Sequence, residues 1–109
     1  MNLSKEHLRL YAITDRKWCT DNTLENQIEA AIAGGVTILQ LREKGTDFDN
    51  FLSLALSVRK ITAKFNIPLI INDNVDIAIK CNADGVHVGQ NDSEIAEIRK
   101  RWGNDKIIG

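Results

Sequence analysis

The chain has 109 residues, enough for one small domain, and its 43% hydrophobic residues are sufficient for a core. Its 14 Lys and Arg are balanced by 15 Asp and Glu, which argues against a nucleic-acid or membrane-surface protein because those carry a basic excess. We expect no membrane span or signal peptide, since the sequence holds no apolar run of suitable length. Cys19 and Cys81 have neither metal-ligand spacing nor the density of a disulfide scaffold, so we expect free thiols and a cytoplasmic location.

The first part of the chain predicts two strands with a helix between them. Residues 8–14 and 36–42 are short apolar runs typical of strands. Between them, four apolar residues fall at i, i+4, i+7 and i+8, the spacing of one helical face: Leu24, Ile28, Ala31 and Ile32. Gly34 and Gly35 are expected to end this helix, because glycine readily adopts the left-handed conformation found there.

Alternation along the second strand separates its two faces. Leu39 and Leu41 share one face, which we expect to lie against the helices. The opposite face would line the interior and mouth of a barrel, and it carries a mostly polar series: Ile38, Gln40, Arg42 and Lys44.

The polar residues of this strand suggest a ligand site. An amide such as Gln40 costs free energy inside an apolar strand unless it is hydrogen-bonded, either to a ligand or to a neighbouring strand. Arg42 and Lys44 at the strand end suit an anionic ligand, because the arginine fork matches phosphate oxygens. The alternative is a solvated strand end paired with Glu43 or Asp47.

The remainder of the chain continues the alternation of strands and helices. Thr46-Asp-Phe-Asp49 resembles a capping box, and apolar residues from Phe48 to Phe65 then repeat at three and four, which predicts a long helix. We expect a third strand, a short helix, a fourth strand, a fourth helix and the start of a fifth strand at residues 68–73, 75–81, 86–89, 93–102 and 106–109.

This order predicts an α/β fold with a parallel sheet. The repeat of about 25 to 30 residues is the pitch of βαβ units in a (β/α)8 barrel, of which residues 1–109 would supply the first four units and the start of strand five. The chain would then be the N-terminal part of a single barrel domain. A doubly wound open sheet is the alternative, and the absence of G-x-G-x-x-G after the first strand weakens its dinucleotide-binding form.

Polar residues also follow the third and fourth strands. Asp73 and Asp92 offer hard oxygen ligands that could share one Mg²⁺, an ion that proteins bind through one or two carboxylates. Each also precedes a predicted helix, so capping is the alternative role and the more frequent one for such spacing. Asn72 has no helical role of its own, which favours ligand contact.

The sequence shows no arrangement typical of nucleophilic catalysis. It lacks a Ser-His-Asp pattern, a zinc motif and a Walker loop. His87 lies within a strand, where a histidine is more often a hydrogen-bonded interior group than a catalyst, and Tyr11 is expected to serve packing.

Four segments taken together resemble the thiamine-phosphate synthase family in content, order and spacing. They are Leu10-Tyr-Ala-Ile-Thr-Asp15, Leu39-Gln-Leu-Arg-Glu-Lys44, Leu69-Ile-Ile-Asn-Asp73 and Ala83-Asp-Gly-Val-His-Val-Gly-Gln-Asn-Asp92. The resemblance implies a (β/α)8 barrel that joins hydroxymethylpyrimidine diphosphate to thiazole phosphate, forming thiamine phosphate and releasing pyrophosphate. It also implies a dissociative path, in which the thiazole nitrogen traps a pyrimidine-stabilised carbocation and no protein nucleophile is required.

The resemblance also implies roles for individual residues. Gln40 would address the pyrimidine, while Arg42, Lys44 and Asn72 would hold the diphosphate. Asp73 and Asp92 would ligate Mg²⁺ as the cofactor. The residues implied to contact the pyrimidine diphosphate are Gln40, Leu41, Arg42, Glu43, Lys44 and Asn72.

The family chain is about twice as long as this one, in line with the lower size bound of such barrels. We therefore expect this chain to carry the diphosphate and metal half of the site, to be inactive alone, and to self-associate or need the other half. The expected partners are small-molecule substrates. Two alternatives are a non-catalytic half-barrel that binds or assembles, and a thiazole tautomerase-like paralogue, which the full set of diphosphate residues disfavours.

Overall fold

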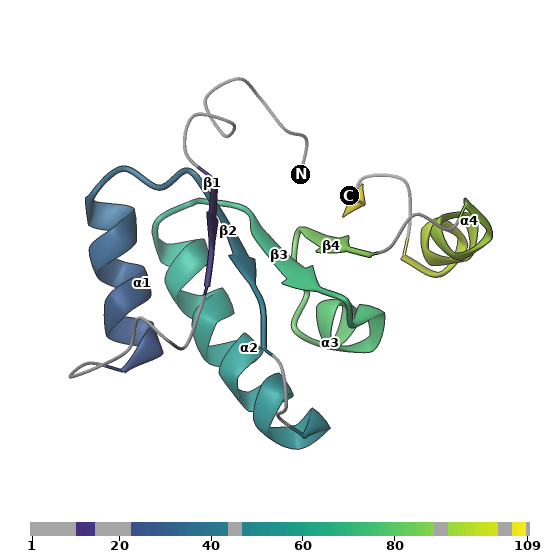
Figure 1. Ribbon diagram of the computed structural model, residues 1–109, viewed down its shortest axis with the longest axis horizontal. Helices are drawn as coiled ribbons and strands as arrows, with labels where there is room; N and C mark the ends of the chain where they lie inside the picture. Colours follow the sequence, from purple (N-terminus) through teal and green to yellow (C-terminus); the bar gives the residue numbers. More distant parts are fainter. Residues whose placement is uncertain (1–10, 15–22, 44–46, 89–91, 103–105, 109) are drawn as a thin grey trace.

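The computed structural model describes residues 11–14, 23–43, 47–88, 92–102 and 106–108, in which strands and helices alternate (Figure 1). The elements are β1 (Tyr11–Ile13), α1 (Leu24–Ala33), β2 (Ile38–Leu41), α2 (Phe48–Lys64), β3 (Leu69–Asn72), α3 (Val75–Lys80), β4 (Gly85–His87), α4 (Asp92–Trp102) and β5 (Ile107–Ile108). The predicted order of elements is confirmed, although the strands are shorter than the apolar runs that predicted them. None of these described helices has the length and apolar character needed to cross a bilayer.

The strands form one sheet whose spatial order follows the sequence. The order is β1-β2-β3-β4-β5, and every neighbouring pair is parallel. A doubly wound sheet would reverse its strand order at a switch point. In the described part of the chain the order does not reverse, so the doubly wound alternative is wrong for these five strands.

The hydrophobic core lies between one face of the sheet and the helices. Leu39 and Leu41 of β2 belong to this core, as the alternation along that strand predicted. All four described helices contribute to the same cluster, and Figure 1 shows α1 and α2 beside the first strands and α3 next to β3 and β4. Its fully buried members include Leu41, Ala55, Val58, Leu69, Ile71, Ile77 and Val86.

The opposite face of the sheet is polar toward the carboxyl ends of its strands. Ile38 and Ile70 are buried there but do not belong to the helix-packed core. Tyr11 and Ile13 on the same face are each 44% exposed. The strand register places further side chains on this face, namely Gln40, Asn72 and His87.

Two helix caps differ by one residue from their expected positions. The Asp47 side chain caps α2 by accepting a hydrogen bond from Asn50 N at 2.8 Å, so the predicted cap at Thr46 is one residue too early. Thr46 itself lies outside the described residues. Asn74 caps α3 by accepting from Ile77 N at 3.0 Å, and the capping role considered for Asp73 is therefore wrong.

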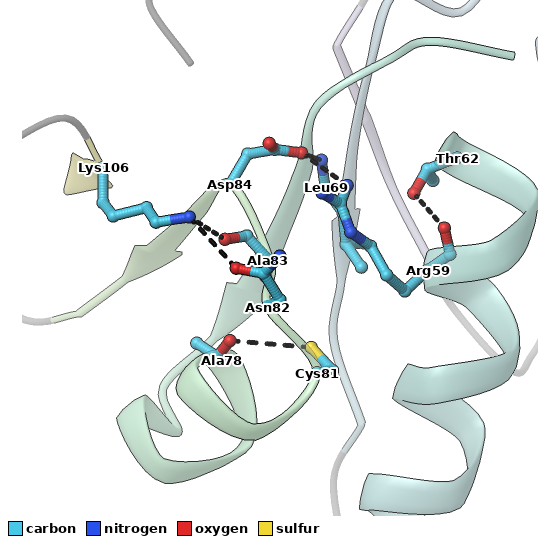
Figure 2. Close-up of polar contacts among 9 residues, drawn as sticks. All are labelled: Arg59, Thr62, Leu69, Ala78, Cys81, Asn82, Ala83, Asp84 and Lys106. Carbon is cyan, nitrogen blue, oxygen red and sulfur yellow. Dashed lines mark hydrogen bonds and ion pairs between the residues drawn. The ribbon is translucent and has the colours of Figure 1, made fainter. Parts of the chain in front are cut away.

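A buried polar cluster ties α2 to the amino ends of β3 and β4 (Figure 2). Asp84 is buried, and its Oδ2 accepts hydrogen bonds from Arg59 at 2.9 Å and from Leu69 N at 2.8 Å. Lys106, beside β5, donates to Asn82 Oδ1 and to the Ala83 carbonyl in the loop before β4. These contacts lie at the end of the sheet opposite to the predicted ligand residues.

Candidate functional site

The carboxyl ends of the first four strands bring together polar residues that are far apart in sequence. Ligand sites of open and closed parallel sheets lie at this end. Direct contacts connect β1 with β2 and β2 with β3, and the register places Asn72 beside His87 on β4. Gln40, Arg42, Asn72 and Asp73 lie at the carboxyl ends of the neighbouring strands β2 and β3, and the side chains of Gln40 and Asn72 are in direct contact.

Gln40 lies at the centre of this rim and is 3% exposed. Its Nε2 donates to Tyr11 Oη at 2.7 Å, and its Oε1 accepts from Asn72 Nδ2 at 3.0 Å. The cost of burying an amide in an apolar strand is therefore offset by hydrogen bonds to both neighbouring strands. Each bond leaves part of the amide's capacity unused, since an amide has two protons and two lone pairs.

Thr14 fixes the backbone of Arg42, the residue that follows β2. Its hydroxyl accepts a hydrogen bond from Arg42 N at 3.0 Å and lies 3.4 Å from the Arg42 carbonyl, to which it donates. Its own N–H donates to the Gln40 carbonyl at 3.0 Å. The pairing of β1 with β2 thus continues one residue past the strands, while the Arg42 side chain itself is exposed. An exposed guanidinium at this end of the sheet is available to an anionic ligand.

Asp73 has an unusual backbone conformation at the end of β3. Its φ is 64°, in the left-handed region, which non-glycine residues adopt at a cost and often near functional sites. Its N–H donates to the His87 carbonyl at 2.7 Å, which fixes this conformation beside β4. Because Asn74 caps the following helix, the exposed Asp73 carboxylate is not used as a cap. Its oxygens are hard ligands of the kind that Mg²⁺ prefers.

The remaining predicted residues differ in how the structure places them. Leu41 is fully buried in the helix-packed core, so its backbone alone faces the ligand end. Glu43 is half-buried just beyond the strand. Asp92 is the first residue of α4, and its side chain lies outside the described part of the chain, as does Lys44 altogether.

Within the described ranges, no three His, Cys, Asp or Glu side chains gather as a metal-binding group. Mg²⁺ does not require such a group, because one or two carboxylates with water and phosphate oxygens complete its coordination.

Two residues at this rim were not predicted to have a role there. Tyr11 was expected to serve packing; the residue is 44% exposed and its hydroxyl contacts Gln40. His87 is exposed and pairs with Asn72 across β3 and β4. Strand parity alone could not find them, because placing both residues on the face of Gln40 also requires the register between the strands.

The fold is of the α/β class, with a parallel sheet whose carboxyl-end rim carries polar side chains and one exposed arginine. The family model described as thiamine monophosphate synthase matches residues 10–109, and the chain belongs to this family. Thiamine-phosphate synthase of Ruminiclostridium cellulolyticum is 52% identical over 106 residues, covering 97% of this chain and 50% of that protein. The corresponding protein of Clostridium botulinum is 51% identical over 100 residues, covering 92% of this chain and 47% of that protein.

A solved structure shows the same architecture. Thiamine phosphate pyrophosphorylase from Pyrococcus furiosus superposes with a TM-score of 0.83 at 29% identity, covering 95% of this chain and 50% of that one. The chain therefore spans about half the length of these relatives. The yeast Saccharomyces cerevisiae carries a similar segment within a thiamine biosynthetic bifunctional enzyme, 48% identical and covering 92% of this chain but 19% of that protein.

Proposed function

We propose that this chain supplies the pyrimidine-diphosphate and magnesium half of a thiamine-phosphate synthase, a transferase built on a (β/α)8 barrel. The observation that carries the proposal is the hydrogen bond between Gln40 and Asn72, which unites two expected substrate contacts from different strands at one rim. Relatives that are named thiamine-phosphate synthase share about half of their aligned residues with this chain, which favours the synthase over the tautomerase-like paralogue. The sequential strand order is the order that a barrel requires. The free, buried Cys81 fits action in a reducing cytoplasm.

The described residues have distinct proposed roles in binding hydroxymethylpyrimidine diphosphate. Gln40 offers its remaining amide proton to a ring nitrogen of the pyrimidine, and Arg42 offers a planar fork to diphosphate oxygens. Asn72 donates its second Nδ2 proton to the diphosphate, because the first is used by Gln40. Lys44 would add a second cation to the same group, and Leu41 and Glu43 would contribute through the backbone of this segment.

Departure of pyrophosphate requires that charge on its oxygens be neutralised, and the proposed residues are suited to that task. When bound, Mg²⁺ would supply further positive charge to neutralise the leaving pyrophosphate. Asp73 fits this ion because its carboxylate is exposed at the rim and free of the capping role, and Asp92 is its proposed co-ligand. Arg42 stabilises the same developing charge without any proton transfer. The thiazole nitrogen is the attacking group, so no protein nucleophile is needed.

Calorimetry tests the proposal directly. The 109-residue chain is titrated with hydroxymethylpyrimidine diphosphate in the presence and absence of Mg²⁺, and saturable binding that depends on Mg²⁺ is expected. Arg42→Ala should weaken that binding by about tenfold, as loss of a charged hydrogen bond does. The matched control is Arg101→Ala, which removes an exposed arginine whose Asp76 partner lies on α3. Equal affinities with and without Mg²⁺ would contradict the proposed metal role, and no binding would contradict the proposed function.

We also propose that the 109-residue chain alone does not turn over both substrates and that it self-associates or needs a second half. Among the described residues, β1 and β5 each pair with one neighbour, and unpaired strand edges favour association. Tyr11 and Ile13 add exposed apolar surface next to the β1 edge. Size-exclusion chromatography with hydrogen exchange should show oligomers or weak protection of β1 and β5. A well-protected monomer, or measurable turnover by the purified chain, would contradict this proposal.

A further inference from the structure

Tyr11, Gln40 and Asn72 form a hydrogen-bonded row across three adjacent strands. The row runs obliquely over the sheet, because Gln40 is paired by register with Ile13 and Ile70 and not with the two residues that it bonds. Asn72 Nδ2 donates to Gln40 Oε1, and Gln40 Nε2 donates to Tyr11 Oη. Both atoms at the end of the Gln40 side chain are therefore held by protein partners.

The burial of the row differs strongly between its members. Gln40 is 3% exposed, whereas Tyr11 is 44% exposed. The tyrosine thus supplies one of two anchors for a buried amide from a position at the open face of the sheet. A bond of 2.7 Å is at the short end of hydrogen-bond distances, which indicates a well-formed contact.

The two anchors determine which atoms Gln40 can offer to a ligand. One Nε2 proton is used by Tyr11, so a single proton remains, and its direction is fixed by the plane of the amide. A ring nitrogen of a pyrimidine is an acceptor and needs that proton. Rotation of the amide by half a turn would place the Gln40 carbonyl oxygen where the proton was. The carbonyl oxygen and the ring nitrogen are both acceptors, so they could not form a hydrogen bond.

We propose that Tyr11 is a positioning residue that acts through Gln40: its hydroxyl holds the Gln40 amide in place, while the donor Asn72 Nδ2 sets the orientation in which the remaining amide proton meets the pyrimidine ring. The inference rests on the proposed function for the identity of the ligand, but the positioning itself is a property of the chain. Tyr11→Phe is the sharpest variant, because it removes the hydroxyl and keeps the ring. Ile13→Val is the matched control, since Ile13 lies on the same strand face with the same exposed fraction.

The first measurement needs no ligand. Side-chain amide protons of Gln40 are followed by NMR, and their exchange with solvent should become about fivefold faster in Tyr11→Phe, because a hydrogen bond of ordinary strength is lost. Ile13→Val should leave that exchange rate unchanged. An unchanged rate in Tyr11→Phe would overturn the proposal, whatever the chain binds.

The second measurement compares two probes in the presence of Mg²⁺. Tyr11→Phe should weaken the binding of hydroxymethylpyrimidine diphosphate by about fivefold. It should leave the binding of inorganic pyrophosphate unchanged, because pyrophosphate has no ring for Gln40 to contact. In a Gln40→Ala background, Tyr11→Phe should have no further effect. Equal weakening of both probes, or an effect that persists without Gln40, would overturn the positioning role. Failure of the unsubstituted chain to bind either probe would instead contradict the proposed function, and the amide exchange would still decide the role of Tyr11.

Discussion

Arg59 and Asp84 form a short ion pair inside the molecule, with 2.9 Å between the guanidinium and the carboxylate. The side chains are 24% and 6% exposed. Arg101 and Asp76 make the same contact at 2.8 Å, but those side chains are 49% and 60% exposed. These two arginine–aspartate pairs therefore have similar separations in different surroundings. The buried carboxylate also accepts the Leu69 N–H, so it serves the backbone of β3 as well as α2.

We predict that Asp84→Ala lowers the free energy of unfolding by about 3 kcal/mol, because it leaves a partly buried guanidinium and a buried N–H without their partner. Asp76→Ala should cost less than about 1 kcal/mol, since exposed ion pairs contribute little. Urea unfolding followed by circular dichroism measures both. Similar losses for the two variants would show that burial does not set the strength of the pair.

Alternation was sufficient to predict the faces of β2. Leu39 and Leu41 lie in the helix-packed core and Gln40 lies on the other face, because side chains of a strand alternate whatever its neighbours are. The partners of Gln40 could not be predicted in the same way. They come from β1 and β3, and their contact depends on a register that no local pattern contains. The burial of Asp84 is a similar case, since its partner Arg59 lies 25 positions away.

The helix caps show a second limit on what the sequence alone can predict. Thr46 and Asp47 are both good capping residues, as are Asp73 and Asn74, and sequence alone cannot choose between neighbours with equal chemistry. In each case the second residue caps the helix. For Asp73 this has a functional consequence, because the carboxylate that precedes the cap remains available at the rim.

Thr14→Val should remove the hydrogen bonds that join the end of β1 to the backbone of Arg42. The substitution keeps the shape of the side chain but removes the hydroxyl that bonds both backbone groups of Arg42. We expect a loss of about 1 kcal/mol in stability and about fivefold weaker binding of pyrimidine diphosphate, because the Arg42 backbone is no longer fixed. Calorimetry and urea unfolding check the two effects. Thr14→Ser keeps the hydroxyl and is the control; if it weakens binding as much as valine does, the hydroxyl is not responsible.

Asp73→Asn removes the charge of this side chain while keeping its backbone conformation. Asparagine tolerates a φ of 64° as well as aspartate does, so we expect stability to change by less than about 0.5 kcal/mol. The Mg²⁺-dependent part of pyrimidine-diphosphate affinity should fall by at least about tenfold, because a neutral amide is a poor ligand for this ion. Asp76→Asn, which neutralises an exposed carboxylate on α3, is the control. Retention of full Mg²⁺ dependence in Asp73→Asn would remove this residue from the metal site.

The buried thiol of Cys81 leads us to predict that the protein loses stability at alkaline pH. Burial raises the pKa of the Cys81 thiol, and a hydrogen bond with the Ala83 backbone together with the positive charge of Arg59 opposes this only in part. As pH rises above the ordinary thiol pKa of about 8.5, the unfolded chain loses this proton while the folded chain keeps it. The unfolded state then binds fewer protons, so the stability present below that pH is lost as pH rises toward the raised pKa.

The measurement is urea unfolding at about pH 7.5 and about pH 10, on either side of the ordinary thiol pKa. It is made in a Cys19→Ser background so that a single thiol titrates. Stability should fall more between the two pH values for this chain than for its Cys81→Ser derivative, because serine does not ionise in this range and the other titrating groups are common to both. The thiol should also react slowly with an alkylating reagent at the lower pH and rapidly once the chain is unfolded. Equal pH dependence in the two proteins, or fast alkylation of the folded chain, would show that Cys81 is not a buried, protonated thiol.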